Sequence, residues 1–192
     1  MSYDYKIFAG ATWNPVFRYA SSVLTSKAIT GITKAAPMVV TAVGHAAPDG
    51  WPAAVVSAGG MTQANATRYP PQGLDWKAAT LLTADTVAFN KVNSADFTTY
   101  TSGGFLVYYT PVDLTTVSAA VLSIYDNPEH SGTPLATLSI GSGITLDNTA
   151  KTITGSLATA ALTWTTGYYE LLLTLASGRI VQLLKGTITI ES

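Results

Sequence analysis

Few side chains in this chain of 192 residues could do chemistry near neutral pH. The sequence has two histidines, His45 and His130, and histidine is the side chain whose ordinary pKa lies closest to neutrality. These two are therefore the candidate near-neutral acids or bases. The sequence has no cysteine, which excludes disulfides, thiolate metal ligands and cysteine nucleophiles.

The acidic residues close to His130 raise the question of a metal site. Asp126, Glu129 and His130 lie within a few residues of one another and could together hold a hard or borderline cation. We prefer a solvated turn, in which Asp126 and Asn127 hydrogen-bond to their own backbone. His45, in the segment VGHAAPDG, is interpreted as a turn or core residue rather than a ligand. No metal ligand, cofactor site or catalytic residue is assigned.

The sequence contains none of the common motifs for nucleophilic catalysis or phosphate binding. No serine stands in a GxSxG pattern, and the Gly-Ser-Gly segment at 141–143 is typical of a turn between strands. Neither GxGxxG nor GxxxxGKS/T, whose backbone amides hold phosphates, occurs. The sequence therefore favours a protein that is not an enzyme and that uses no cofactor.

The composition limits the kinds of partner. Charged residues make up 11% of the chain, against about 25% in typical soluble domains, and the net charge is −1. Such a chain lacks the basic surface that nucleic acids and anionic membranes attract, and no apolar run approaches the ~20 residues of a membrane span. A surface so poor in charge is typical of one that faces neighbouring subunits. A neutral β-surface rich in threonine and serine is the alternative.

Both ends of the chain have the pattern of strands separated by turns. Apolar residues alternate with polar ones from Tyr3 to Ile7, as in a half-buried strand, and apolar residues stand at every second position from Tyr169 to Leu175, where they would line one strand face. Asp147-Asn148 is predicted to connect a hairpin. One short helix is predicted at 156–162, where Ser156 offers a capping oxygen. The spacing of strands and turns predicts an all-β fold, an antiparallel β-sandwich.

The segment 28–104 has a different composition. It contains five of the nine prolines, carries short apolar pieces, and ends in Gly103-Gly104. Its two tryptophans, Trp51 and Trp76, stand beside proline, glycine and aspartate, so we expect them to be exposed anchors for another protein. A sugar-stacking platform is the alternative role. Trp13 and Trp164 lie in strand patterns and are expected in the core.

Four segments from the two ends of the chain carry a family resemblance: DYKIFAGATWNPVFRY, PVDLTTVSAAVLSIYDN, GITLDNTAKTITGSLATAAL and GYYELLLTLASGRIVQLLKGTITI. Together they resemble a small β-sandwich domain common in tailed-bacteriophage structural proteins, such as the N-terminal domain of upper baseplate and fibre-attachment proteins. The middle of the chain, with ITGITKAAPMVVTAVGHAAPDG and LTADTVAFNKVNSADFTTYTSGG, is similar to the β-barrel-like module named in phage proteins after the FCCH domain of ubiquitin-activating enzyme.

The resemblance implies a division of the chain and a function. Residues 1–27 and 105–192 would form one split β-sandwich, and 28–104 would form an inserted β module. The protein would be a non-enzymatic virion component whose partners are other virion proteins, as a homo-oligomer or symmetric array. The leading expectation is a tail, baseplate or neck adaptor. A capsid decoration protein is the second, and a receptor- or glycan-binding module the third.

The same resemblance implies where the protein is found. The start of the chain, MSYDYKIFAG, lacks a basic segment followed by an apolar one, so no signal peptide is predicted. We therefore expect synthesis in the host cytoplasm and a final place in the virion.

Overall fold

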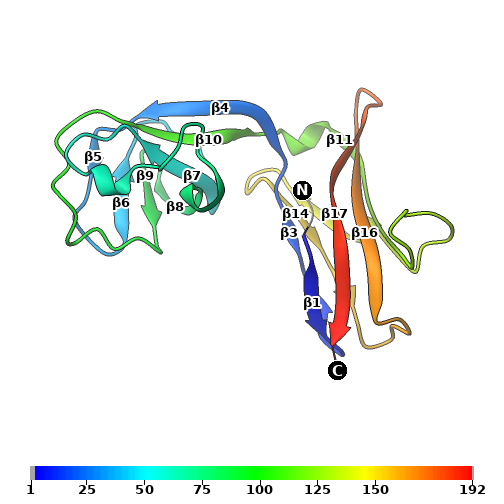
Figure 1. Ribbon diagram of the computed structural model, residues 1–192. Coiled ribbons are helices and arrows are strands. Elements are labelled where there is room, and N and C mark those ends of the chain that lie inside the picture. The colour runs from blue at the N-terminus through cyan, green and yellow to red at the C-terminus, as the bar shows by residue number, and fades with distance from the viewer. Residues whose placement is uncertain (1–2, 192) are drawn as a thin grey trace. The chain divides into compact units, whose positions relative to one another are not determined.

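The chain folds into two compact units, each built of β-strands. The computed structural model describes residues 3–191. The first unit, here called the split unit, comprises the N-terminal residues through Tyr19 and the residues from Asp113 onward. The second, the inserted unit, comprises Ala20–Val112. Figure 1 shows both units, with most of their strands labelled. The all-β fold predicted from the sequence is confirmed.

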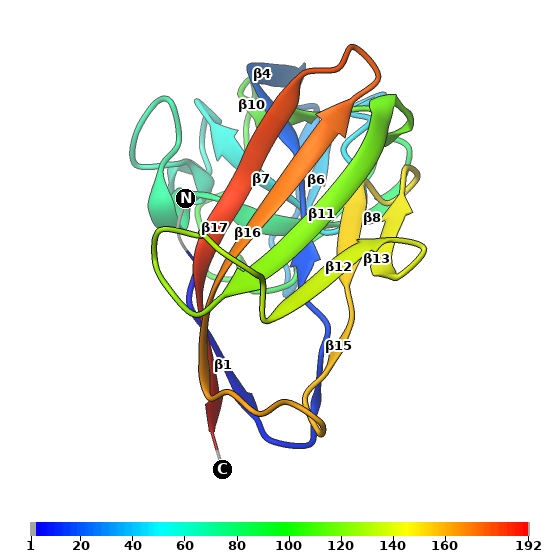
Figure 2. The same cartoon turned by 90° about the vertical axis from the view of Figure 1, so that its right-hand side faces the viewer.

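An eight-stranded sheet forms most of the split unit, in the order β1-β17-β16-β11-β12-β13-β14-β3, and β15 pairs with β2 beside it. Most neighbours are antiparallel, and the pairs β1–β17 and β12–β13 are parallel. Figure 2 shows the long strands β17, β16 and β11 side by side. The strands are β1 Tyr5–Phe8, β2 Thr12–Trp13, β3 Val16–Phe17, β11 Val117–Tyr125, β12 Ala136–Ile140, β13 Gly143–Asp147, β14 Thr152–Gly155, β15 Leu157–Ala158, β16 Thr166–Leu175 and β17 Ile180–Glu191.

Alternation of side chains explains how this sheet encloses a core. Along β16, Tyr169, Leu171 and Leu173 are fully buried, while the residues between them are partly exposed. These side chains pack with buried residues from both ends of the unit, including Trp13 and Ile188. Burying each such side chain contributes roughly 1.5–3 kcal/mol to folding. The core is therefore what joins the N-terminal strands to the C-terminal ones.

The prediction of a short helix at 156–162 is wrong. Leu157–Ala158 forms strand β15, whose partners are Trp13 and Thr12 of β2. The following residue, Thr159, gives its backbone N–H to the carbonyl of Ala11 at 3.0 Å. Backbone groups of this segment are thus bonded to a neighbouring strand, so tertiary pairing overrides the local helix preference. Within residues 3–191 the helical elements are three 3-10 turns: η1 Thr62–Ala64, η2 Gly73–Asp75 and η3 Leu114–Thr116.

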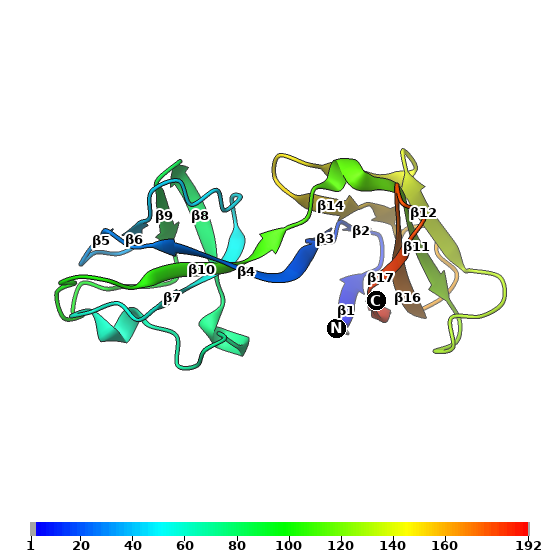
Figure 3. The same ribbon diagram turned by 90° about the horizontal axis from the view of Figure 1, so that it is seen from above.

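The inserted unit is a seven-stranded sheet in the order β4-β10-β7-β8-β9-β6-β5. Its first and last strands in that order, β4 and β5, are separated in the chain by only Ile29 and Thr30. The two ends of the sheet therefore meet at one bend, and the sheet curls around its own core (Figure 3). The strands are β4 Ala20–Ala28, β5 Gly31–Ile32, β6 Met38–Thr41, β7 Trp51–Val56, β8 Lys77–Thr83, β9 Thr86–Phe89 and β10 Phe105–Pro111.

The observed division of the chain differs from the predicted boundaries at 27/28 and 104/105. Those boundaries leave β4 and β10 with the split unit. In the structure β4 pairs with β10, and β10 pairs with β7 of the inserted unit. Leu106 and Tyr108 of β10 lie buried in the core of the inserted unit. The inserted unit therefore begins at Ala20 and ends at Val112.

Candidate functional site

Trp51 is a core residue, contrary to the prediction that it is an exposed anchor. Its side chain is 1% exposed, and its indole Nε1–H donates a hydrogen bond of 2.8 Å to the carbonyl of Tyr109. The inward position follows from the pleat of β7, because its neighbour Pro52 takes the outward position. A fully buried indole cannot contact another protein, so Trp51 is not an interaction anchor.

Trp76 lies partly exposed on the outer face of the inserted unit. Its ring contacts that of Tyr109, with centroids 5.3 Å apart and planes at 41°. Beneath it lies a small buried cluster, Ala54, Val56 and Val107, contributed by β7 and β10. Trp76 is therefore held by packing from below while its outer side remains open to solvent.

Further apolar side chains share the face of Trp76. Phe105 and Tyr109 stand on the same side of β10 as Val107, and Phe105 is 45% exposed. Leu24 of β4 lies directly opposite Tyr109, so it lies on that face too. We call these four residues the Trp76 surface: Trp76, Tyr109, Phe105 and Leu24. Because none of the four residues is charged, the Trp76 surface can bind a partner through dispersion and aromatic stacking.

The turn before Trp76 is fixed by Asp75. The carboxylate Oδ1 accepts hydrogen bonds from the backbone N–H and the hydroxyl of Thr67, at 2.9 and 3.0 Å. Oδ2 accepts a bond of 3.2 Å from the N–H of Gln72. The backbone N–H of Thr67, followed by that of Gln72, lowers the pKa of Asp75 below its ordinary value. Sequence reasoning missed Asp75, although Gln72 and Asp75 have the spacing of a capping box.

The inserted unit also has a small, partly open pocket of about 30 Å³, lined by Met38, Asp75 and Lys77 among others. This volume suits one or two water molecules and is far below that of a ligand pocket. The pocket therefore gives no reason to add a small-molecule site to the Trp76 surface.

The histidines have structural environments. His45 is fully buried, accepts a hydrogen bond at Nδ1 from the N–H of Ala47 at 3.1 Å, and has Nε2 3.2 Å from the carbonyl of Thr83. This confirms the core interpretation of His45. Among residues 3–191, no group of three or more histidine and acidic side chains is placed to hold a metal ion.

The turn near His130 is organised by Asn127. Its side chain donates to Asp126 Oδ1 at 2.7 Å and to the carbonyl of Ser131 at 2.9 Å. The His130 ring contacts Tyr125 edge-on, with centroids 5.9 Å apart. Asn127 therefore bonds within its own turn, as predicted for a solvated turn.

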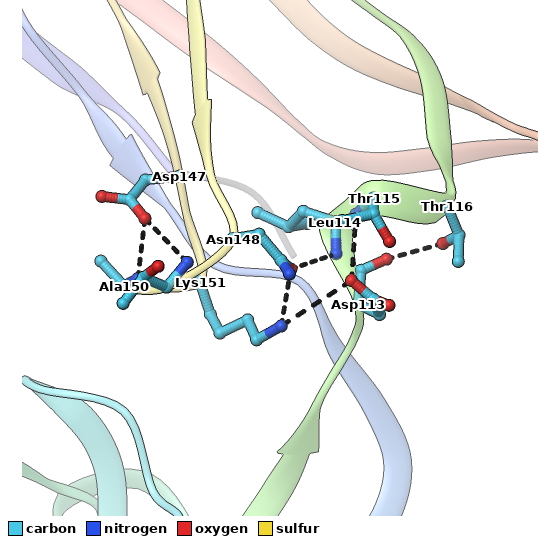
Figure 4. A network of polar contacts seen from close by, with 9 residues as sticks. Asp113, Leu114, Thr115, Thr116, Asp147, Asn148, Ala150 and Lys151 are labelled. Carbon is cyan, nitrogen blue, oxygen red and sulfur yellow. Dashed lines mark hydrogen bonds and ion pairs between the residues drawn. The ribbon is translucent and has the colours of Figure 1, made fainter.

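A second polar arrangement lies in the split unit, at the turn 148–151 between β13 and β14 (Figure 4). The side-chain oxygen Oδ1 of Asn148 accepts hydrogen bonds from the N–H of Leu114 at 2.8 Å and from Lys151 Nζ at 2.6 Å. Lys151 Nζ lies 3.9 Å from Asp113 Oδ1. The backbone N–H of Thr115 is the main cause that lowers the pKa of Asp113.

Arg18 contacts the same turn, donating a bond of 3.0 Å to the carbonyl of Ala150. Arg18 and Asp113 flank the two positions where the chain passes into and out of the inserted unit. The chain segments at both crossings between the units therefore contact the same turn of the split unit, residues 148–151. We call this arrangement the crossing clasp: Arg18, Asp113, Asn148 and Lys151.

Comparison with protein-family models and with curated proteins finds no match for this chain. No helix within residues 3–191 is long and apolar enough to cross a membrane. The phage resemblance of the sequence motifs therefore stays a prediction, and the functional argument depends on the surfaces described above.

Proposed function

We propose that this protein is a non-enzymatic bacteriophage virion component that acts through assembly contacts, as a tail, baseplate or neck adaptor. The proposal combines the sequence resemblance with one observation on the structure. Large apolar side chains are exposed to solvent on the surface of both β-units, and charged residues make up only 11% of the chain. Exposed apolar surface of this kind is characteristic of protein contacts.

The exposed apolar side chains are numerous and well exposed. Thirteen large ones are exposed among residues 3–191; Phe8 is 69% exposed, Tyr69 68% and Leu74 94%. Single exposed apolar residues are common on any protein, but the Trp76 surface combines one of them, Phe105, with the partly exposed Trp76, Tyr109 and Leu24 on one face. This surface supports a contact with another virion protein or with a second copy of the chain.

The proposed mechanism is geometric and needs no bond chemistry. Each contact can be modest, because a symmetric ring or array repeats it and the copies bind together. The clasp would keep the two crossings of the chain in place while the inserted unit contacts a neighbour. Such a component is made in the host cytoplasm and ends in the virion.

The second candidate function is capsid decoration. The protein composition of separated heads and tails distinguishes a decoration protein from a tail adaptor. Virions of the phage that encodes this chain are purified, heads and tails are separated, and the protein is quantified in each by mass spectrometry. A tail adaptor is expected in the tail fraction in a ring-sized number of copies. A decoration protein would be in the head fraction in hundreds of copies. Absence from both fractions would exclude a virion role.

A glycan-binding role is the third candidate, and the stacked Trp76–Tyr109 pair is the observation that favours it. Phage particles made with the Trp76→Ala variant distinguish a glycan-binding role from an assembly contact. A glycan site predicts normal particle yield with lost adsorption to cells, whereas an assembly contact predicts reduced incorporation of the protein into particles.

A further inference from the structure

The outer edge of β4 is the longest uncovered strand edge of the inserted unit. β4 has nine residues, none of them buried, and it stands last in the sheet with β10 as its neighbour. The strand at the other end of the order, β5, has two residues. Within the described part of the chain, no strand pairs with β4 on the side away from β10.

The hydrogen-bond pattern shows which backbone groups point outward. The N–H of Ile29 donates to the carbonyl of Gly104 at 3.0 Å, on the β10 side. In an antiparallel pair the bonded side alternates from residue to residue. The N–H of Thr30 accordingly donates to Thr41 on the opposite side, at 2.9 Å. By the same alternation the outward N–H and C=O groups of β4 belong to Leu24, Ser26 and Ala28.

This edge has little of the protection that exposed strands usually carry. Natural edges are blunted by proline, by several charges or by bulges. β4 contains no proline and one charged residue, Lys27. Its register shift lies opposite Tyr109–Pro111, which leaves 24–28 in regular pairing with β10. The regular segment is therefore free to accept another strand.

We propose that this edge pairs with the same edge of a second copy of the chain, antiparallel and centred on Ser26. In this register Ser26 faces its own copy and Leu24 faces Ala28, so every outward backbone group of the regular segment gains a partner. Lys27 then lies opposite Thr25, and the two lysines do not face each other. The contact uses the same surface twice, so it closes as a dimer rather than growing into a fibre.

The side chains favour this partner as well. Leu24, Ser26 and Ala28 stand on the face of the sheet that carries Phe105 and Tyr109. Pairing would bring two Trp76 surfaces together across the two-fold axis and cover part of each. This face carries no charge in either copy near the axis, so no buried charge would be left unpaired.

The inference deepens the proposed assembly function by naming a partner for the inserted unit. Its test uses the purified full chain, whereas the test of the proposed function uses particle composition. If the dimer test fails, the result on particle composition can therefore still be interpreted, and the reverse also holds.

The experiment is sedimentation velocity on the wild type and on Ser26→Lys and Ser26→Glu. The wild type is expected to form a dimer. Each variant places like charges opposite each other at the axis, so its dimer dissociation constant should rise about tenfold or more. An equimolar mixture of the two variants places Lys opposite Glu and should recover dimers. Ser142→Lys, on an exposed turn of the split unit, is the matched control and should remain dimeric.

Hydrogen exchange on the wild type gives a readout that needs no variant. The amides of Leu24, Ser26 and Ala28 should exchange more slowly at concentrations where the dimer forms, while Lys27 should be protected throughout. A wild type that is monomeric up to its solubility limit would overturn the proposal. So would a dimer that Ser26→Lys does not weaken, or slowed exchange at a site other than β4.

Discussion

Two tryptophans that look alike in the sequence have opposite roles. Trp51 and Trp76 both stand near proline, glycine and aspartate, and both were expected on the surface. Trp51 lies on the inner side of the curled sheet with its indole N–H bonded to the carbonyl of Tyr109, while Trp76 packs on the outer side of the same sheet. The difference comes from the pleat of β7 and from the loop that returns to the sheet after Asp75.

This difference predicts unequal losses of stability. Trp51→Ala should lower the free energy of unfolding by about 3–5 kcal/mol, because it empties a core position and leaves the partly buried carbonyl of Tyr109 without its donor. Trp76→Ala should cost about 1–2 kcal/mol, because part of that ring already faces water. Urea unfolding followed by circular dichroism measures both. Equal losses, or a larger loss for Trp76→Ala, would contradict the assigned positions.

At the residue scale the sequence located the core histidine and the turn around Asn127, and it chose Trp76 as a surface residue. It did not locate the partners of these residues. Tyr109 joins Trp76 only because β10 runs next to β7, and that pairing connects segments about fifty residues apart. Local composition carries no signal for such a contact.

At the scale of elements, the crossing clasp connects pieces that are distant in the chain. Asn148 lies in the turn after β13, and its side chain satisfies the N–H of Leu114, which is itself buried. Lys151 adds a long ion pair to Asp113, whose side chain is 57% exposed. Solvent screens such a pair, so the neutral hydrogen bond is the stronger part of the clasp.

The clasp predicts an order of effects for two neighbouring variants. Asn148→Ala should lower the free energy of unfolding by about 1–2 kcal/mol, because the N–H of Leu114 loses its acceptor. Lys151→Ala should have a much smaller effect. Thermal unfolding of the two variants in parallel checks the order. A larger loss for Lys151→Ala would mean that the contacts of Lys151 with Asp113 and Asn148, rather than the bond from Leu114 to Asn148, hold the turn.

The strands were easier to predict than their partners. Alternation of apolar residues located β1 and β16, because half-buried strands repeat every second residue. The segment after Ser156 was misassigned, since short alanine-rich sequence favours helix when no partner is considered. Its pairing with β2, about 145 residues earlier in the chain, supplied the backbone bonds that a helix would otherwise provide.

At the scale of the whole molecule, the all-β character followed from strand spacing and turn residues, and the insertion was expected from the change in composition at 28–104. The inserted unit extends beyond 28–104 in both directions along the chain, to Ala20 and Val112, because β4 and β10 pair with each other. Ladder bonds between strands about eighty residues apart decide this boundary. The glycine and proline content of the sequence had placed the C-terminal boundary of the inserted unit at the Gly103-Gly104 pair.

Both proposals concern contacts beyond the single chain. The charge-poor composition and the Trp76 surface support assembly into a particle, and the β4 edge supports pairing of two copies. Neither contact requires a change within the β-units. The chain would act as a preformed part whose surfaces are used repeatedly in one structure.

The most direct measurement of the assembly role counts complete particles by electron microscopy after infection with a phage that carries a nonsense mutation in this gene. We expect incomplete particles, and we expect the purified chain, added to the extract, to restore complete ones. The Trp76→Ala chain should restore fewer. Complete, infectious particles formed without the protein would contradict the account.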